Sequence, residues 1–195
     1  MTGNRWLQTL ATNPGHSAWY IERWRTMEDE GKDLHGEARF VDAMVGRGAR
    51  ILDAGCGQGR VGGRLAQLGH HVVGVDIDPA LVAAAEEQFR GATWHVGDLA
   101  ELDLGGERFD AIGSAGNVVT FIDPSTLGEV LRRLGDHLAP EGRLAVGFGA
   151  GRDLTFDDFF AEAAGAGLRA ELRLSTWDLR PFTPESDFLV AVLTR

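Results

Sequence analysis

From Arg50 onward, the hydrophobic pattern of the chain alternates between two periods. Short runs rich in Val, Ile and Leu are followed by longer segments in which apolar residues recur every third or fourth position. This alternation is typical of parallel strands joined by right-handed helical crossovers. It predicts strands near residues 50–54, 71–76, 92–96, 109–114, 142–148, 168–175 and 187–194. Helices are expected between them, near 59–69, 79–89, 124–138 and 154–165.

The last two predicted strands are separated only by RPFTPESD, which is too short for a helical crossover. They should therefore be antiparallel. The expected fold is α/β: a doubly wound, seven-stranded sheet, mostly parallel, with an antiparallel C-terminal hairpin. With no internal repeat or long linker, we expect a single domain over 1–195, consisting of an N-terminal helical cap (1–45) and a sheet core (46–195).

The charge balance argues against a polyanionic partner. The chain carries 19 Lys and Arg against 29 Asp and Glu, a formal net charge of -10. Such a charge repels nucleic acid and anionic membranes unless a basic patch overrides it. The pair Arg132 and Arg133 is better explained as the solvated face of a helix. We expect no nucleic-acid partner.

Cysteine content and hydropathy favour the cytoplasm. Cys56 is the only cysteine, so an intramolecular disulfide is impossible. The first residues, MTGNRWLQTL, lack the apolar stretch of a signal peptide, and the apolar run FLVAVL is too short to span a bilayer. Neither paired cysteines, an H-x-x-x-H motif nor a dense acidic cluster is present, so we expect no metal site.

The stretch ILDAGCGQGR, residues 51–60, contains three glycines at the turn between the first predicted strand and helix. In open α/β sheets, ligands bind beyond the carboxyl ends of the strands, and this turn commonly forms part of the crevice. Gly55, Gly57 and Gly59 permit positive φ and let a ligand lie against bare backbone amides. The loop therefore indicates a nucleotide-like ligand, although a tight turn alone would also use glycine.

An acidic residue ends the next predicted strand, in VVGVDIDPALV. A carboxylate at Asp76 can accept hydrogen bonds from both hydroxyls of a ribose. Asp78, which precedes Pro79, already suits the N-cap of the following helix, so Asp76 remains free for a ligand.

The spacing of the loop distinguishes two cofactor types. Dinucleotide-binding loops read G-x-G-x-x-G, whereas this loop reads G-x-G-x-G and follows Asp53. An acid there would repel a pyrophosphate and attract an ammonium group. A cationic amino-acid tail fits better than a nicotinamide dinucleotide. The alternative for Asp53 is that it braces the loop through backbone amides.

Together these motifs resemble those of class I S-adenosylmethionine-dependent methyltransferases, in a small, bacterial-type form without an appended domain. The similarity extends over about residues 48–149, through ILDAGCGQGR, VVGVDIDPALV, WHVGDLAEL, FDAIGSAGNVVTFI and LRRLGDHLAPEGRLAVGFG. It implies a Rossmann-like fold and S-adenosylmethionine as cofactor. The nicotinamide oxidoreductase remains a weaker alternative, as does a non-catalytic, regulatory protein that binds S-adenosylmethionine.

The resemblance also implies roles for particular residues. The methionine moiety would be surrounded by Asp53, Gly55, Cys56, Gly57 and Gly59. Asp76 would hold the ribose, Ile77 would pack on the adenine, and Asp98 with the Leu99 amide would bind the adenine edge. Asp98 also suits a helix N-cap, and the two roles are compatible. Ser114 ends the strand that faces the reaction centre. Cys56 is interpreted as a small packing residue, because no neighbouring histidine would activate it as a nucleophile.

The acceptor side is expected around the loop GSAGNVVTF and the helix in HSAWYIERWRTM. The loop lacks the Asn/Asp-Pro-Pro-aromatic signature of enzymes that methylate adenine or glutamine, and Asn117 could orient an acceptor or bond its own loop. The helical spacing places His16, Trp19, Tyr20, Arg23, Trp24 and Met27 on one face. That face would cover the sulfonium, with Trp24 against the cofactor; plain packing is the alternative.

The candidates for proton removal are His16, Tyr20 and Asn117, although methyl transfer by in-line positioning needs a base only if the acceptor arrives protonated. His35 and Arg39 are secondary pocket candidates. His70 and His71 are expected to face solvent at a strand start. The small size and the charge favour a small-molecule acceptor, methylated on oxygen or nitrogen.

Overall fold

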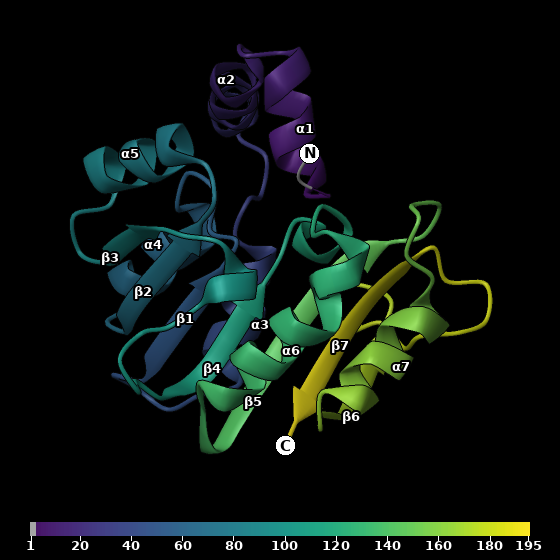
Figure 1. Cartoon of the computed structure of the whole chain (residues 1–195). Coiled ribbons are helices and arrows are strands. Elements are labelled where there is room, and N and C mark those ends of the chain that lie inside the picture. Colours follow the sequence, from purple (N-terminus) through teal and green to yellow (C-terminus); the bar gives the residue numbers. More distant parts are fainter. Residues whose placement is uncertain (1–2) are drawn as a thin grey trace.

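The computed structural model describes residues 3–195, which contain a seven-stranded sheet of order β3-β2-β1-β4-β5-β7-β6 (Figure 1). The strands are β1 (Arg50–Ala54), β2 (His71–Asp76), β3 (Thr93–Val96), β4 (Phe109–Ser114), β5 (Leu138–Gly149), β6 (Arg169–Leu174) and β7 (Phe188–Thr194). Pairing is parallel from β3 through β5, whereas β7 is antiparallel to both β5 and β6. The predicted fold is therefore confirmed.

The helices are α1 (Arg5–Thr12), α2 (His16–Asp29), α3 (Gly36–Ala43), α4 (Arg60–Gln67), α5 (Pro79–Gln88), α6 (Leu127–Asp136) and α7 (Phe156–Gly165). Short 3₁₀ turns are η1 (Leu99–Glu101), η2 (Val118–Thr120) and η3 (Pro124–Thr126). The helix expected near 124–138 is thus divided into η3 and α6. Asp123 accepts a hydrogen bond from the Ser125 N–H, which starts a tight turn before the α-helix.

β5 begins earlier than the sequence predicts. Leu138 already pairs with Phe109, and a register irregularity follows before Arg143 pairs with Ala111. The segment Ala-Pro-Glu-Gly between them has the composition of a turn, so hydrophobic periodicity alone places the start of the strand near 142. The irregularity leaves the carboxyl end of β5, where it borders the site, in the expected place.

Two layers of helices cover the sheet. On one face, buried residues of α6 and α7 pack with β1, β4, β5 and β7 in the largest hydrophobic cluster. On the other face, Val61 and Leu65 of α4 pack with Ile51 of β1. His70, expected to face solvent, is buried beside this second layer, and its Nε2 lies 2.8 Å from Asp42 Oδ1. A carboxylate partner from α3 explains why a polar strand start is buried there.

A helical cap is predicted over residues 1–45, and the structure forms α1, α2 and α3 within this range. Its first two residues lie outside the described part of the chain. α1 and α2 lie over the carboxyl ends of the strands, whereas α3 packs against a face of the sheet (Figure 1). The apolar residues Ala38 and Val41 of α3 are buried with Ile51 and Ala111, which ties this helix to the core.

Candidate active site

The glycine loop is held against β2 by its backbone. The N–H groups of Gly55 and Cys56 both donate to the carbonyl oxygen of Val75, at 2.8 and 3.0 Å. Gly59 lies at φ +81°, and a Cβ atom on it would lie 2.8 Å from Ala85 Cβ. Packing therefore requires glycine at this position. Gly55, which borders a cavity together with Gly57, is restricted as well, because a Cβ on it would lie 2.5 Å from Val118 Cγ1.

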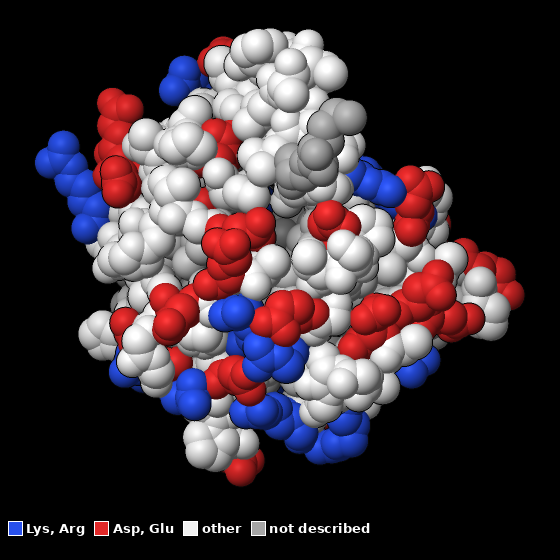
Figure 2. All heavy atoms as spheres, viewed as in Figure 1, with Lys and Arg blue, Asp and Glu red and all other residues white. Residues whose placement is uncertain are grey.

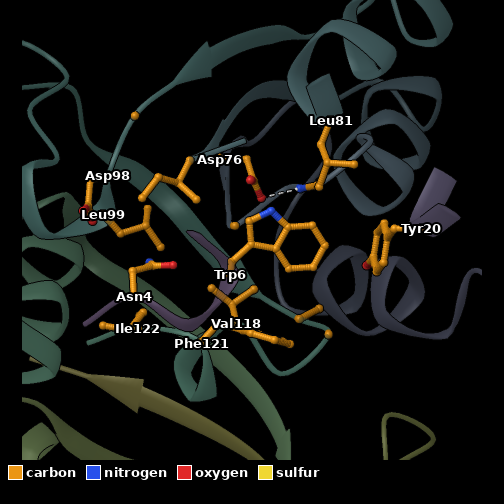
Figure 3. Close-up of a pocket in the computed structure, with 16 residues that line it drawn as sticks. Asn4, Trp6, Tyr20, Asp76, Leu81, Asp98, Leu99, Val118, Phe121 and Ile122 are labelled. Carbon is orange, nitrogen blue, oxygen red and sulfur yellow. Dashed lines mark hydrogen bonds between the residues drawn. The ribbon is translucent and has the colours of Figure 1, made fainter. Parts of the chain in front are cut away.

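This main cavity, at the carboxyl ends of β1, β2, β3 and β4, encloses about 660 Å³ of empty space open to solvent (Figure 3). Among the residues proposed from the sequence, it is lined by Tyr20, Gly55, Gly57, Asp76, Ile77, Asp98 and Leu99. The structure thus brings the motif residues of three successive strands into one cavity.

Asp76 is fixed by backbone donors. Its Oδ2 accepts from the Gly57 N–H at 2.8 Å and its Oδ1 from the Asp78 N–H at 2.9 Å. Burial raises the pKa of the Asp76 carboxyl above its ordinary value. Since each carboxylate oxygen has two lone pairs, both oxygens retain one acceptor position for a ligand hydroxyl.

Asp98 has the N-cap role in the structure, and its adenine-binding role stays a prediction. Its Oδ1 accepts from the Ala100 N–H at 2.9 Å and caps η1, while the residue also lines the main cavity. This hydrogen bond holds the Asp98 carboxylate at the edge of the cavity (Figure 3).

A smaller space of about 350 Å³ lies on the other side of the glycine loop. We call it the loop recess; it is lined by Tyr20, Trp24, Asp53, Gly55, Cys56, Gln58, Arg60, Val61, Ala115 and Gly116. Tyr20, Gly55, Ala115 and Gly116 line the main cavity too, so the two spaces adjoin.

Asp53 is buried, with 3% of its surface exposed, and its Oδ2 accepts from the Gly62 N–H at 2.7 Å. Burial raises the pKa of Asp53 to about 7, opposed in part by that hydrogen bond. The bracing role that the sequence allowed is therefore present, and the same carboxyl also borders the loop recess.

Arg60 and Gln58 are recess residues that the motif analysis missed. The Arg60 guanidinium pairs with Glu37 through two hydrogen bonds, of 2.6 and 2.9 Å, and its Cζ lies 4.3 Å from the centre of the Trp24 ring. Gln58 Oε1 is buried and has no hydrogen-bond partner in the described chain. The sequence indicates these two residues only by their position, since both belong to the glycine-loop segment 51–60.

The cap is attached to the site through Asp78. This buried residue caps α5 through its Oδ1, which accepts from the Ala80 N–H at 2.9 Å. Its Oδ2 accepts from Trp6 Nε1 at 2.9 Å and from the Ser17 hydroxyl at 2.5 Å. Trp6 thereby lies inside the main cavity (Figure 3). A tryptophan in α1 without any motif around it gave no sequence signal for this position.

The aromatic face expected on α2 is divided by the structure. Tyr20 and Trp24 border the loop recess, whereas Trp19 is 54% exposed and the His16 ring stacks on it at 5.2 Å. Arg23 is exposed too, with its Cζ 5.8 Å from the Trp19 ring centre. The inward direction of the helix is set by Ser17, which bonds Asp78, so His16 lies outside the walls of both cavities.

Of the remaining candidates, Tyr20 and Cys56 border the cavities, whereas Asn117 and Ser114 line neither. Burial raises the pKa of the Tyr20 phenol, which therefore stays protonated near neutral pH. Burial also raises the pKa of the Cys56 thiol well above its ordinary value, as expected for a packing residue. Asn117 Oδ1 accepts from the Gly149 N–H at 2.8 Å and so joins its loop to the end of β5. Ser114 is buried beneath the site and lines neither cavity.

Charges on the face shown in Figure 2 are mixed, with Lys and Arg interspersed among Asp and Glu and the cap end mostly uncharged. Within residues 3–195, no helix is long and apolar enough to cross a membrane. No group of three or more His, Cys, Asp or Glu in that range is placed to hold a metal ion.

Comparison with known proteins gives consistent matches. Residues 51–142 match the family described as "Methyltransferase domain". The crystal structure of a TehB-like SAM-dependent methyltransferase from Corynebacterium glutamicum is 48% identical, with a TM-score of 0.91, over 94% of this chain and 100% of that one.

Two curated relatives match a smaller part of the chain. The magnesium-protoporphyrin O-methyltransferase of Rhodobacter capsulatus is 39% identical over 59% of this chain and 53% of its own length. The dTDP-3-amino-3,6-dideoxy-alpha-D-glucopyranose N,N-dimethyltransferase of Streptomyces fradiae is 31% identical over 61% of this chain and 48% of its own length. The chain thus spans about half the length of these curated relatives.

Proposed function

The chain belongs to the class I S-adenosylmethionine-dependent methyltransferases, and from this premise we propose that it methylates an oxygen or nitrogen atom of a small-molecule acceptor. One observation carries the proposal. Two adjoining cavities meet at Tyr20 and Gly55, one bordered by the carboxylates of Asp76 and Asp98, the other by Asp53. A ligand with a nucleoside at one end and a cationic amino-acid tail at the other matches this division.

We place the adenosine of the cofactor in the main cavity. The free acceptor positions on Asp76 would receive the two ribose hydroxyls, and Asp98 would receive the adenine amino group. Ile77 and Leu99 line the same cavity and would pack against the base. Trp6, which already lies there, would cover the nucleoside from the cap side.

The amino-acid tail would occupy the loop recess. The residues present fit it: Asp53 offers a carboxylate, the unpartnered Gln58 Oε1 offers an acceptor for an ammonium, and Arg60 offers a cation for a carboxylate. An unpaired buried carbonyl oxygen costs free energy that a donor from the ligand would recover.

When bound, the cofactor supplies a methyl group already activated by a positively charged sulfur. The contribution of the chain is then to hold the acceptor in line and to exclude water. Such positioning lowers the activation free energy by up to roughly 7–11 kcal/mol. The cap helices and Tyr20 are placed for this task at the junction of the two cavities. The protonated phenol of Tyr20 suits it to orient an acceptor by a hydrogen bond rather than to act as a general base.

Two considerations support a small acceptor. The relatives named above include an O-methyltransferase and an N,N-dimethyltransferase, which supports both acceptor atoms. The net charge of -10 disfavours nucleic acid. The non-catalytic alternative predicts that the protein binds the cofactor without converting it to S-adenosylhomocysteine in the presence of any acceptor.

The test combines calorimetry with a transfer screen. S-adenosylhomocysteine should bind far more tightly than NAD, and Asp76→Ala should weaken that binding at least tenfold by removing hydrogen bonds worth about 1.5–3 kcal/mol each. Asp103→Ala is the matched control, since that carboxylate accepts from a turn amide and lines neither cavity. Methyl transfer from labelled cofactor is then screened over small metabolites beside tRNA, DNA and protein. Tighter binding of NAD, or labelling of a macromolecule alone, would contradict the proposal.

A further inference from the structure

A third hollow, separate from both site cavities, follows the face of the sheet next to α3. This groove encloses about 1180 Å³ of space open to solvent. Its sides come from α3, β6 and the turn over residues 175–181, and its floor from β5 and β7. Its larger apolar lining residues are Phe40, Met44, Leu172, Trp177, Leu179 and Val192.

The groove exists because this face of β7 and β6 is only partly covered. Val190, Val192 and Leu174 of these strands form a small cluster with Phe40, and α3 is the one described helix that contributes to it. The helices α6 and α7 pack with the large cluster on the opposite face. The antiparallel end of the sheet thus has a helical layer on one side and an apolar groove on the other.

Two leucines project from the rim of this groove into solvent. Leu172 is 43% exposed and Leu179 is 63% exposed. Leu179 also has φ +72°, a left-handed conformation that is rare for a bulky apolar residue and free of strain for glycine. A strained backbone that presents a large apolar side chain to water is unfavourable for an isolated chain, and it is explained if another surface covers that side chain.

The charges around the groove are divided between its two sides. Arg39 lies on the α3 side, where Arg143 also donates to the Met44 carbonyl. Glu171 and Asp178 lie on the opposite side. Arg39 pairs with Asp33 and Asp178 with Arg180 in exposed contacts, whereas Glu171 has no ion-pair partner in the described chain.

We propose that this groove is the contact surface of a homodimer, with the two-fold axis running along the groove. A rotation about that axis places the basic side of each copy against the acidic side of the other. An axis across the groove would instead oppose like charges, so the charge division selects the first arrangement. In it, Leu172 and Leu179 of one chain cover the apolar lining beside α3 of the other. The proposal does not depend on the methyl-transfer function.

The test is the mass of the full chain, measured by light scattering and sedimentation from micromolar to sub-millimolar concentration. The wild type should reach the mass of two chains, and Leu179→Asp should weaken its self-association at least tenfold. Leu179→Gly keeps the fold, because glycine relieves the positive φ, and it should also weaken association. A wild type that stays monomeric throughout would overturn the proposal.

Charge reversal tests the face and the axis together. Arg39→Glu and Glu171→Arg should each weaken association about tenfold, because each opposes like charges at two symmetric positions. The double variant restores the opposite-sign contact and should recover the affinity of the wild type to within a few-fold. Arg25→Glu is the control: this arginine is a similarly exposed, ion-paired residue of α2 outside the groove. A dimer unaffected by all groove variants would place the interface elsewhere and refute the assignment.

Discussion

Replacing Asp53 by asparagine should stabilise the cofactor-free protein, and the gain should grow with pH. Burial raises the pKa of Asp53 from 3.8 to about 7. In the unfolded chain this carboxyl loses its proton near pH 4, whereas in the folded chain it keeps the proton until about pH 7. The unfolded state therefore binds fewer protons between these values, so stability falls as pH rises across this window.

The size of the effect follows from the two pKa values. A rise from 3.8 to about 7 corresponds to about 4 kcal/mol, at roughly 1.4 kcal/mol for each tenfold change in proton affinity. This is an upper bound, and because the side chain is only 3% exposed, little of it is lost to solvent screening. The asparagine oxygen can still accept from the Gly62 N–H, so the hydrogen bond that braces α4 is retained.

Urea unfolding of wild type and Asp53→Asn at about pH 4 and about pH 8.5 measures this contribution. The unfolding free energy of the variant minus that of the wild type should be about 2–4 kcal/mol larger at about pH 8.5 than at about pH 4. Any cost of the buried amide that does not depend on pH cancels in this comparison. Asp103→Asn, at an exposed turn, should show no such shift. A wild-type-to-variant difference that does not change with pH would refute the reasoning.

The same substitution should reduce cofactor binding. If Asp53 faces the ammonium of the amino-acid tail, Asp53→Asn should lower the affinity for S-adenosylhomocysteine at least tenfold, since a hydrogen bond to a charged group is worth about 1.5–3 kcal/mol. Methylthioadenosine, which lacks that tail, should bind both proteins alike. For the wild type, affinity for S-adenosylhomocysteine should rise as pH increases through about 7, because the carboxyl must ionise to attract the ammonium. Equal losses for the two ligands would place the tail elsewhere.

Three further predictions address the loop, the recess and the cap. Gly59→Ala should lower the unfolding free energy in a urea titration by about 1–3 kcal/mol, because φ is +81° and the new Cβ would lie 2.8 Å from Ala85 Cβ. In calorimetry, Arg60→Lys should weaken the binding of S-adenosylhomocysteine but not that of methylthioadenosine, since lysine cannot reproduce the bidentate ion pair with Glu37. Trp6→Phe should speed hydrogen exchange over residues 16–27, because it removes the hydrogen bond from Trp6 to Asp78. In the wild type, added S-adenosylhomocysteine should slow the exchange of the same residues. Unchanged exchange in both experiments would mean that the cap is fixed by packing alone.

The sheet and the carboxylates at its edge were predictable because their signals are local. Strand periodicity located β1, β2 and β4 at their observed bounds, and parallel strands bring their carboxyl ends to one edge. Asp76 is the last residue of β2 and Asp98 lies two residues after β3, so their place in one cavity followed from topology. Asp78 was correctly expected to cap α5, because an acid before proline at a helix start has a local function.

The cap was less predictable, because its orientation depends on contacts between segments far apart in the chain. Helical spacing groups Trp19 and Arg23 with Tyr20 and Trp24, but it cannot say which side of this broad face turns inward. The bond from Ser17 to Asp78 decides that direction and turns Trp19 outward. Asn117 shows the same limit, since its partner is the Gly149 amide at the end of another strand.

The cap and the proposed ribose site form one hydrogen-bonded unit. The Asp78 N–H donates to Asp76 Oδ1, while the Asp78 side chain holds Trp6 of α1 and Ser17 of α2. Release of the cap would leave the buried Asp78 Oδ2 without both of its side-chain donors, at a free-energy cost that a charged group makes larger. A nucleoside bound at Asp76 would fix the same two-residue segment from the cavity side. Ligand binding and cap closure therefore favour the same position of the chain, and Trp6, which lines the same cavity, would add a direct contact between the cap and the nucleoside.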